Sequence, residues 1–398
     1  MREFLARYFK GDPVIWAIIV ILSLYSLLAV YSSTGTLAYK FHGGNTFYYL
    51  LRHSMFLVLG LFVTYLLHLV HYKYYIRLAR LFLYISVFLL AFTLILGTSL
   101  NSATRWITLP GGLTFQTSDF AKLALIMYLA KHLSQNQDNI KDYEITYKPM
   151  IRWVAAIVIL ILPANFSTAA IVFITAAVIM FVGRVDVKHL FRTFGIGLAG
   201  VFLIGIIIFN FPNILPRGET WKGRIENFSS GDSETNFQAE QAIIAVVDGG
   251  FIGKGPGNSS QRNFLPHPYS DFIYAIIIEE YGIILGGIPI LLLYLYLLFR
   301  AGIVVRKSSR TFPALLAFGL AFSLVFQGMI NMAVNVNLIP VTGQTLPFVS
   351  MGGTSIVFTS GALGIILSIS RTNQNSTEND TATEPSGEPG KETAEGNN

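Results

Sequence analysis

Long apolar runs are the feature of this 398-residue chain that most restricts its fold. Crossing the hydrocarbon core of a membrane as a helix takes about 20 apolar residues, and ten runs approach that length. Unpaired backbone groups are too costly in lipid, so such runs must form helices or a closed barrel. The runs are continuous in Leu, Ile, Val and Phe rather than alternating, which argues against a barrel. The sequence predicts an all-α polytopic membrane protein with about ten transmembrane helices, at roughly 14–31, 47–70, 79–97, 118–133, 150–165, 167–183, 190–211, 283–300, 311–334 and 346–369.

The distribution of Lys and Arg predicts the orientation of these spans. Lys and Arg are concentrated in the cytoplasmic loops of membrane proteins. If both termini of this chain are cytoplasmic, the short connectors on the opposite side carry almost no Lys or Arg. We expect Val14–Val30 to stay as an uncleaved first span, because it is long for a signal-peptide core. The polar tail, residues 372–398, is expected to be disordered in the cytoplasm, leaving 1–371 as the transmembrane domain. The basic residues expected inside are Arg2, Arg7, Lys10, Lys73, Arg77, Arg80, Lys131, Lys141, Lys148, Arg152, Arg184, Lys188, Arg192, Arg300, Arg306, Lys307, Arg310 and Arg371.

Two segments on the expected outer side are longer than simple connectors. The first, Thr98–Ser118, contains Arg105 and a Gly-Gly turn. The second is a large extracytoplasmic loop of about residues 212–270. Apolar stretches at 237–247 and 269–281 predict two short helices, one within this loop and one where it returns to the membrane.

Composition excludes several classes of function. The net charge of +6 follows from the inside loops, so no nucleic-acid partner is expected. The absence of Cys excludes disulfides, thiolate metal sites and Cys nucleophiles, and the seven His show no metal-binding spacing. No G-x-S-x-G marks a Ser nucleophile. Gly249–Gly257 lacks the spacing of a phosphate-binding loop and indicates a tightly turning segment instead.

An acidic residue stands where the long loop returns to the membrane. Asp271 is placed there to act on a substrate with a lipid anchor and a polar head. As a general base it would accept a proton from a substrate hydroxyl, and Lys254 and Arg262 would keep it ionised. The alternative is an acid that complements a helix dipole, worth up to about 1 kcal/mol. Glu279 and Glu280 follow on the same expected helix, where pairing with a basic loop residue competes with catalysis.

Cations near or within the apolar spans form a second group. Arg52 lies at the outer mouth of the second span, and Lys122 lies within the fourth. One interpretation is that Lys122 snorkels outward to the interface. The other is that both cations join Arg105 and Arg224 in an outward-facing clamp for a diphosphate, whose geometry suits Arg.

The run Ile339–Ser355 opens the last span from the outside. It is too rich in Pro, Gly and polar residues for a lipid-facing helix. Irregular backbone at membrane depth is tolerated only where it lines protein or a wet cavity. We therefore expect this run to face the loop that carries Asp271.

Four segments of the chain resemble the SEDS family (shape, elongation, division and sporulation), and together the likeness covers nearly everything except the tail. The family's G-x-G-x-G-x-S, LP and TDFIF segment and its TG-x-x-LPF-x-S-x-GG signature are the most specific. The segments that carry the resemblance are Gly253–Ser259 with Phe264–Pro266 and Ser270–Ile273, Val341–Ser350 with Gly352-Gly353, Ala103–Ile107 with Phe115–Leu123, and Asn45–Arg52.

The resemblance implies a peptidoglycan glycosyltransferase that polymerises lipid II at the outer face of the cytoplasmic membrane. Asp271 would deprotonate the 4-hydroxyl of the acceptor GlcNAc. That hydroxyl would attack the anomeric carbon of MurNAc on the growing strand and displace undecaprenyl diphosphate with inversion. A divalent cation, Mg²⁺ or Mn²⁺, would come only with the substrate diphosphate. The protein partners would be a class B penicillin-binding protein and other divisome proteins. The implied substrate-binding residues are Arg52, Arg105, Lys122, Arg224, Lys254, Gln344 and Ser350.

The chain departs from the family pattern at three places. Thr117-Ser118-Asp119 stands where Pro-Ser-Glu is usual, Asn165 replaces an Asp, and Met351 replaces a Tyr. The opening segment Phe9–Trp16 resembles the division type, FtsW, more than the elongation type, RodA. Three alternatives stay open: an elongation polymerase, a transporter that flips lipid-linked precursors, and a non-catalytic divisome scaffold. A transporter would need polar residues through both leaflets.

Overall fold

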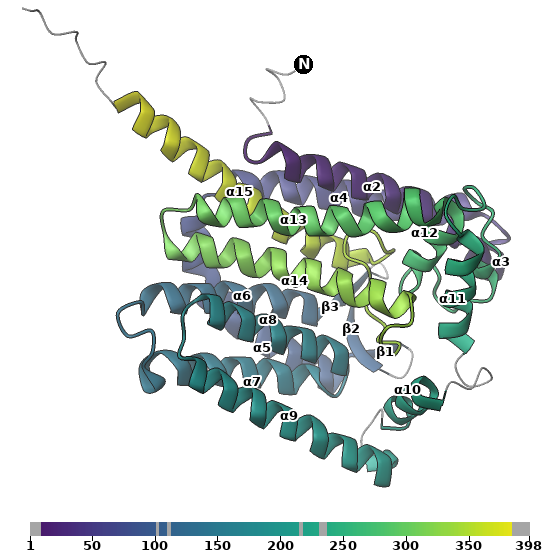
Figure 1. Ribbon diagram of the computed structural model, residues 1–398, viewed down its shortest axis with the longest axis horizontal. Helices are drawn as coiled ribbons and strands as arrows, with labels where there is room; N and C mark the ends of the chain where they lie inside the picture. Colours follow the sequence, from purple (N-terminus) through teal and green to yellow (C-terminus); the bar gives the residue numbers. More distant parts are fainter. Residues whose placement is uncertain (1–8, 101–102, 110–112, 215–217, 231–236, 384–398) are drawn as a thin grey trace, which may run out of the picture.

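The computed structural model describes residues 9–100, 103–109, 113–214, 218–230 and 237–383, and it is a bundle of membrane-length helices (Figure 1). Arg2 and Arg7, which the topology places inside, lie outside the described residues. A helix stands at each of the ten predicted spans, which confirms the all-α polytopic fold. These helices are α2 (Pro13–Ser33), α4 (Thr46–Leu69), α5 (Tyr72–Leu96), α6 (Thr117–Gln135), α7 (Lys148–Ile161), α8 (Phe166–Val182), α9 (Val187–Asn210), α13 (Ile288–Arg306), α14 (Thr311–Asn335) and α15 (Gly353–Thr383).

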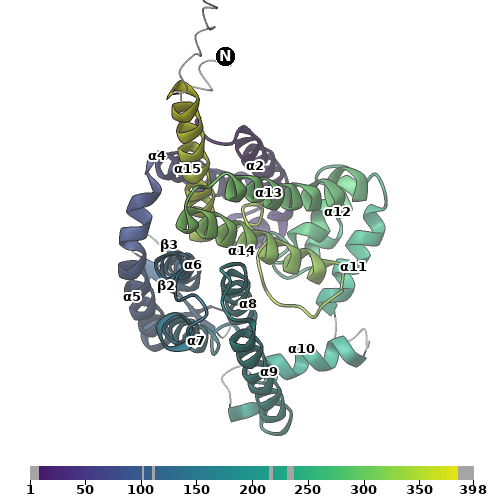
Figure 2. The ribbon, with the colours of Figure 1, turned by 60° about the vertical axis from the view of Figure 1, so that its left-hand side comes forward.

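Seven described helices are long and apolar enough to cross a membrane by length and composition alone. One of them is a continuous stretch from Ile273 to Arg306, in which α12 (Ile273–Gly282) and a π-helical turn, η4 (Ile283–Gly287), lead into α13. The spans outside this group are α6, α7 and α8. α7 and α8 are short, at 14 and 17 residues, and α6 carries Asp119, Lys122 and Lys131. The protein is therefore a multi-pass membrane protein, and α6, the span that carries these charges, packs among α5, α8 and α14 (Figure 2).

The two ends of the transmembrane domain meet at one end of the bundle. The Gly11 N–H donates to Gln374 Oε1 at 3.2 Å, and Gln374 Nε2 donates back to the Gly11 carbonyl at 3.2 Å. Asp12 caps α2 through the Val14 N–H at 2.9 Å and pairs with Arg300 at the end of α13. Both termini consequently leave on the same side, as the predicted topology requires.

Two boundaries of the last span differ from the prediction. α15 begins at Gly353 rather than at 346, because Pro347 and the pair Gly352-Gly353 disfavour an earlier helix start. It continues to Thr383, past the boundary predicted at residue 371, since Pro385 is the first helix breaker beyond it. The rest of the tail, 384–398, lies outside the described residues.

A small antiparallel sheet interrupts the helical pattern after α5. It contains β1 (Thr98–Leu100), β2 (Ala103–Leu109) and β3 (Leu113–Gln116) in that order. The prediction assigned no secondary structure to this segment and missed the strands, although its aromatic and β-branched residues favour them. Thr354 Oγ1 donates to the Thr114 carbonyl at 2.8 Å and ties β3 to the start of α15.

Close contact between α4 and α15 depends on small residues, as is usual between membrane helices. A Cβ on Gly60 would lie 2.5 Å from Ser360 Oγ, and one on Gly364 would lie 2.8 Å from the Thr64 carbonyl oxygen. Thr64 Oγ1 also donates to the Ser360 carbonyl at 3.0 Å. α14 packs beside α15 and is buried along most of its length.

The long loop folds mostly into short helices at the opposite end from the termini (Figure 1). After α9 come η2 (Pro212–Ile214), α10 (Gly218–Ser230), α11 (Phe237–Gly249) and η3 (Gln261–Asn263), and α3 (Gly35–His42) contacts η3. The helix predicted near 237–247 is confirmed as α11. The helix predicted over 269–281 starts later, at Ile273, so Asp271 precedes it instead of occupying its first turn.

Candidate active site

Hydrogen bonds hold the backbone of Asp271 in place, and its carboxylate faces a second segment. Its carbonyl accepts hydrogen bonds from Asn331 Nδ2 at 2.8 Å and Asn335 Nδ2 at 3.0 Å. Ser270 Oγ donates to Asp271 Oδ1 at 3.0 Å. A Cβ on Gly343 would lie 3.5 Å from the other carboxylate oxygen, Oδ2. The carboxylate thus faces a glycine of the irregular 339–352 segment, with no side chain between them.

The 339–352 segment and the 269–271 segment are tied together, which confirms that they face each other. Met351 N–H donates to the Tyr269 carbonyl at 2.9 Å, and Ser350 Oγ donates to the Ser270 carbonyl at 2.6 Å. The Leu346 N–H donates in turn to Ser350 Oγ at 2.8 Å. Phe348 has a φ of +68°, a strained value for a side-chain-bearing residue, and such strain needs this kind of support.

Gln344 and Ser350, expected to bind substrate, are instead used inside the protein. Gln344 is 6% exposed and donates to Thr168 Oγ1 at 3.0 Å. Ser350 is 2% exposed and holds the backbone before Asp271 as described. Ser350 therefore joins the two segments and Gln344 ties the 339–352 segment to α8, so the expectation of substrate contact gives way to these roles.

Tyr269 is a neighbour of the carboxylate that sequence reasoning overlooked. Burial raises the pKa of Tyr269, and the charge of Asp271 and the nearby Tyr49 raise it further. Its hydroxyl lies 3.1 Å from His267 Nδ1. His267 has a φ of +60°, so this turn is strained beside the acid. The half-buried Tyr269 is thus close enough to Asp271 for the two groups to interact electrostatically.

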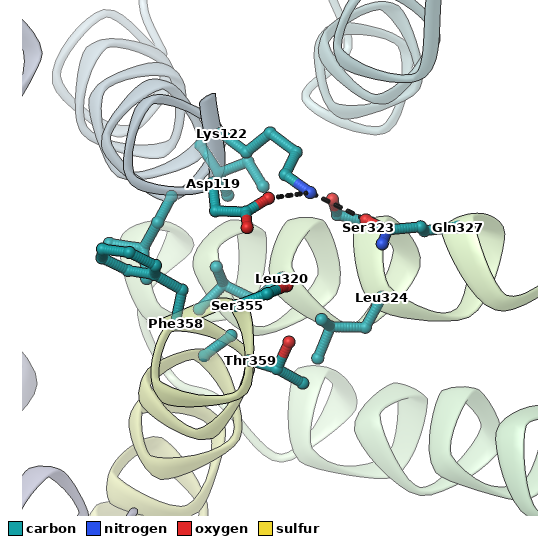
Figure 3. A pocket seen from close by; sticks show the side chains of 12 residues that line it. Asp119, Lys122, Leu320, Ser323, Leu324, Gln327, Ser355, Phe358 and Thr359 are labelled. Carbon is teal, nitrogen blue, oxygen red and sulfur yellow. Dashed lines mark hydrogen bonds and ion pairs between the residues drawn. The ribbon is translucent and has the colours of Figure 1, made fainter. Parts of the chain in front are cut away.

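Lys122 lies inside the bundle rather than at the interface. Its Nζ pairs with Asp119 Oδ1 at 2.9 Å and donates to Gln327 Oε1 at 2.7 Å (Figure 3). These side chains line a small cavity of about 30 Å³ between α6, α14 and α15. The snorkelling interpretation is therefore wrong, since Nζ turns toward α14, and Asp119 already neutralises the charge.

The other three cations of the expected clamp belong to three separate elements. Arg52 is exposed at the outer start of α4 and forms no hydrogen bond or ion pair with the described residues. Arg224 lies on α10, which packs against α9 and η2. The backbone of Arg105 belongs to β2, and its side chain lies outside the described residues. A clamp built from all four stays a prediction.

Lys254 and Arg262 are engaged away from Asp271, contrary to expectation. Lys254 Nζ lies 2.7 Å from Asp248 Oδ2 and 3.0 Å from Glu279 Oε1. Hydrogen bonding to Asp248, and then to Glu279, raises the pKa of Lys254. Arg262 Nη1 donates to the Ser32 carbonyl at 3.2 Å. Neither cation contacts the carboxylate that it was expected to keep ionised.

Glu279 organises the glycine-rich loop, which confirms the pairing interpretation. The side chain is fully buried and accepts hydrogen bonds from the Ser260 N–H at 2.9 Å, the Gln261 N–H at 3.3 Å and the Ser259 hydroxyl, in addition to Lys254. Glu280 is 1% exposed and accepts from the Ser32 hydroxyl. Both acids anchor structure beside the site.

The glycine-rich loop packs backbone to backbone on α12. Lys254 N–H donates to the Glu279 carbonyl and Gly255 N–H to the Glu280 carbonyl, each at 2.9 Å. Gly253 has a φ of +87°, and a Cβ there would lie 2.3 Å from the Glu280 carbonyl oxygen. Glycine is thus required by close approach, and the tight-turn interpretation is confirmed.

Within the described part of the chain, no group of three or more His, Asp and Glu side chains could hold a metal ion.

Comparison with known proteins places this geometry in a family. The family model described as cell cycle protein, FTSW_RODA_SPOVE, matches residues 12–375. Stage V sporulation protein E of Bacillus subtilis is 34% identical over 370 residues, covering 91% of this chain and 98% of that protein. The probable peptidoglycan glycosyltransferase FtsW of Alcanivorax borkumensis is 33% identical, covering 89% and 91%.

Solved structures share the fold. A chain from a study of how a peptidoglycan synthase complex coordinates polymerization and crosslinking gives a TM-score of 0.73 at 23% identity, covering 91% of this chain and 98% of that chain. The rod shape determining protein RodA of Thermus thermophilus gives a TM-score of 0.66 at 24% identity, covering 92% and 99%. The family model matches residues 12–375, and the two relatives are matched along almost their whole length. This chain therefore belongs to the FtsW, RodA and SpoVE family of cell cycle proteins.

Proposed function

We propose that this protein is a peptidoglycan glycosyltransferase of the division type, which polymerises lipid II at the outer face of the cytoplasmic membrane. The names of the relatives support the reaction and the division type. The observation that carries the proposal is the Asp271 carboxylate, which opens toward Gly343 between two irregular segments. These segments stand at the end of the bundle opposite both termini, where an outward-facing lipid-linked sugar would arrive.

Asp271 is the general base in this proposal. Its Oδ2 accepts the proton of the acceptor GlcNAc 4-hydroxyl while that oxygen forms a bond to the anomeric carbon of the donor MurNAc. The bond from that carbon to the diphosphate breaks, undecaprenyl diphosphate leaves with the electron pair, and the configuration inverts. A base of this kind needs hydrogen-bond reach to the hydroxyl, and the side-chain-free Gly343 leaves room for it on the Oδ2 side.

Binding of the diphosphate is proposed for the outer cations. Arg52 is the best placed of them, since it is exposed at the mouth of α4 and forms no hydrogen bond or ion pair with the described residues. Arg105 and Arg224 complete the proposed set, and Lys122 supports it from within the bundle. Mg²⁺ or Mn²⁺ belongs to the proposal only as a companion of the diphosphate, because the described side chains do not form a metal cage. The proposed partners are a class B penicillin-binding protein and other divisome proteins.

The test is polymerisation of fluorescent lipid II by purified protein in liposomes, with and without a class B penicillin-binding protein. Asp271→Ala should abolish polymer, whereas Glu219→Gln, an exposed acid of the same loop, should not. Wild-type activity in Asp271→Ala would remove the base assignment. Transfer of lipid II between leaflets without polymer would favour the transporter, and growth supported by Asp271→Ala after depletion of the native copy would favour the scaffold.

A further inference from the structure

Three amides on one face of α14 connect the segments that flank Asp271. Gln327, Asn331 and Asn335 follow at spacings of four residues, which brings them onto one side of the helix. Their exposed fractions are 6%, 1% and 0%. Buried amides within an apolar span must find partners, and the partners of these three converge on the site.

Gln327 links the ion pair inside the bundle to the 339–352 segment. Its Oε1 accepts from Lys122 Nζ at 2.7 Å, so its Nε2 must point the other way (Figure 3). There Nε2 donates to the Thr345 carbonyl at 3.1 Å. Because Lys122 can only donate, the Asp119–Lys122 pair sets the orientation of this amide.

Asn331 joins the two segments directly. Its Nδ2 donates to the Gln344 carbonyl at 2.7 Å and to the Asp271 carbonyl at 2.8 Å. An amide nitrogen carries two hydrogens in a fixed plane, so both are used and the spacing of the two carbonyls is set by one group. Asn335 adds a bond to the Asp271 carbonyl at 3.0 Å and accepts from the Ala275 N–H at 3.0 Å, which fixes the start of α12.

We propose that Gln327 and Asn331 are positioning residues for Asp271, which set the separation between the Asp271 backbone and the 343–345 backbone. The proposal rests on the role of Asp271 as the base. Backbone carbonyls outside regular structure need such partners at membrane depth, and here the same donors define the opening in front of the carboxylate. Nothing in this arrangement brings Gln327 or Asn331 into contact with substrate.

The kinetic test uses Asn331→Leu and Gln327→Met, with Met329→Leu on the lipid-exposed side of the same helix as the matched control. A misplaced base lowers turnover more than binding, so kcat should fall by about 10- to 100-fold with the KM for lipid II within about twofold. The control should keep both constants. Unchanged kcat in Asn331→Leu would overturn the proposal.

A second readout separates positioning from general stability. The chain has no Cys, so spin labels on His267→Cys and Leu338→Cys, both exposed, report the distance from the Asp271 segment to the end of α14. Asn331→Leu should shift or broaden this distribution, and Met329→Leu should not. A lower kcat with an unchanged distribution would contradict the proposal. Gln327→Met keeps Asn331 in place and provides the same kinetic test if Asn331→Leu does not fold.

The two proposals can fail separately. Full activity in Asp271→Ala would end the base assignment, and the spin-label distances would still show whether Asn331 holds the segment. Loss of activity in Asp271→Ala with normal kcat and normal distances in Asn331→Leu would retain the base and reject the positioning role.

Discussion

The amide of Asn331, in the last turns of the membrane-length helix α14, donates a 2.8 Å hydrogen bond to the carbonyl of Asp271. This bond connects the residue with the clearest functional signature to a helix that is buried along most of its length. It also explains how an acid on a loop is held in place, since rigid placement is what a general base requires. The position of Asp271 is therefore fixed by a membrane helix, α14, as well as by its own loop.

Replacement of Asp271 by Asn should remove the base and retain the shape. General-base contributions are about 10²- to 10⁴-fold, so the rate of lipid II polymerisation should fall by that factor. The melting temperature should change little, because the backbone carbonyl of residue 271 keeps its two Asn partners. Glu219→Gln is the control, and a rate within twofold of wild type in Asp271→Asn would contradict the assignment.

The Asp119–Lys122 pair should show strong coupling. Lys122→Met leaves Asp119 buried without its cation, and breaking a buried pair typically costs about 3–5 kcal/mol. The double variant Asp119→Asn/Lys122→Met removes both charges and should recover part of that loss. Thermal unfolding of wild type, Lys122→Met, Asp119→Asn and the double variant in the same detergent measures the coupling, and additive losses would rule out the buried pair.

Gly253→Ala should destabilise the long loop more than Gly257→Ala. Both glycines have positive φ, at +87° and +79°, so each Ala carries backbone strain of about 1–3 kcal/mol. Only at Gly253 does the added Cβ also meet a backbone oxygen, at 2.3 Å. Limited proteolysis of the loop should detect the difference. Equal protection in the two variants would show that close packing on α12 is not the reason for the glycine.

The stabilising contribution of Lys254 should depend on pH only in the alkaline range. Its pKa is raised above the ordinary 10.5 by its acidic partners. A raised folded-state pKa gives stability that is fully present below the unfolded value and is lost as pH rises through the folded value. The difference in melting temperature between wild type and Lys254→Met should therefore be constant near neutral pH and shrink above about pH 10.5. A difference that changes between about pH 6 and 8 would point to another group.

Helix positions were accessible from sequence because each span must be apolar over its own length, whatever it packs against. The strands at 98–116 were missed, since a short outer segment is not under that constraint. Asp271 was found for a similar local reason, as an acid at the point where a polar loop becomes apolar. Asn331 and Asn335 form a pattern that is visible in the sequence, two amides four residues apart in an apolar run. The pattern does not reveal that both amides bind the Asp271 carbonyl.

By itself, the sequence determined the membrane class, the span positions and the placement of both termini on one side. These follow from hydropathy and charge, which act along the chain. Only the tertiary structure decided the partners of the charged groups. Lys254 pairs with Glu279, Lys122 pairs with Asp119 and Gln327, and Gln344 and Ser350 turn inward. The reason is that a charge or amide inside a bundle takes the nearest partner in space, and for Lys122 and Gln327 the two partners stand 205 residues apart in the chain.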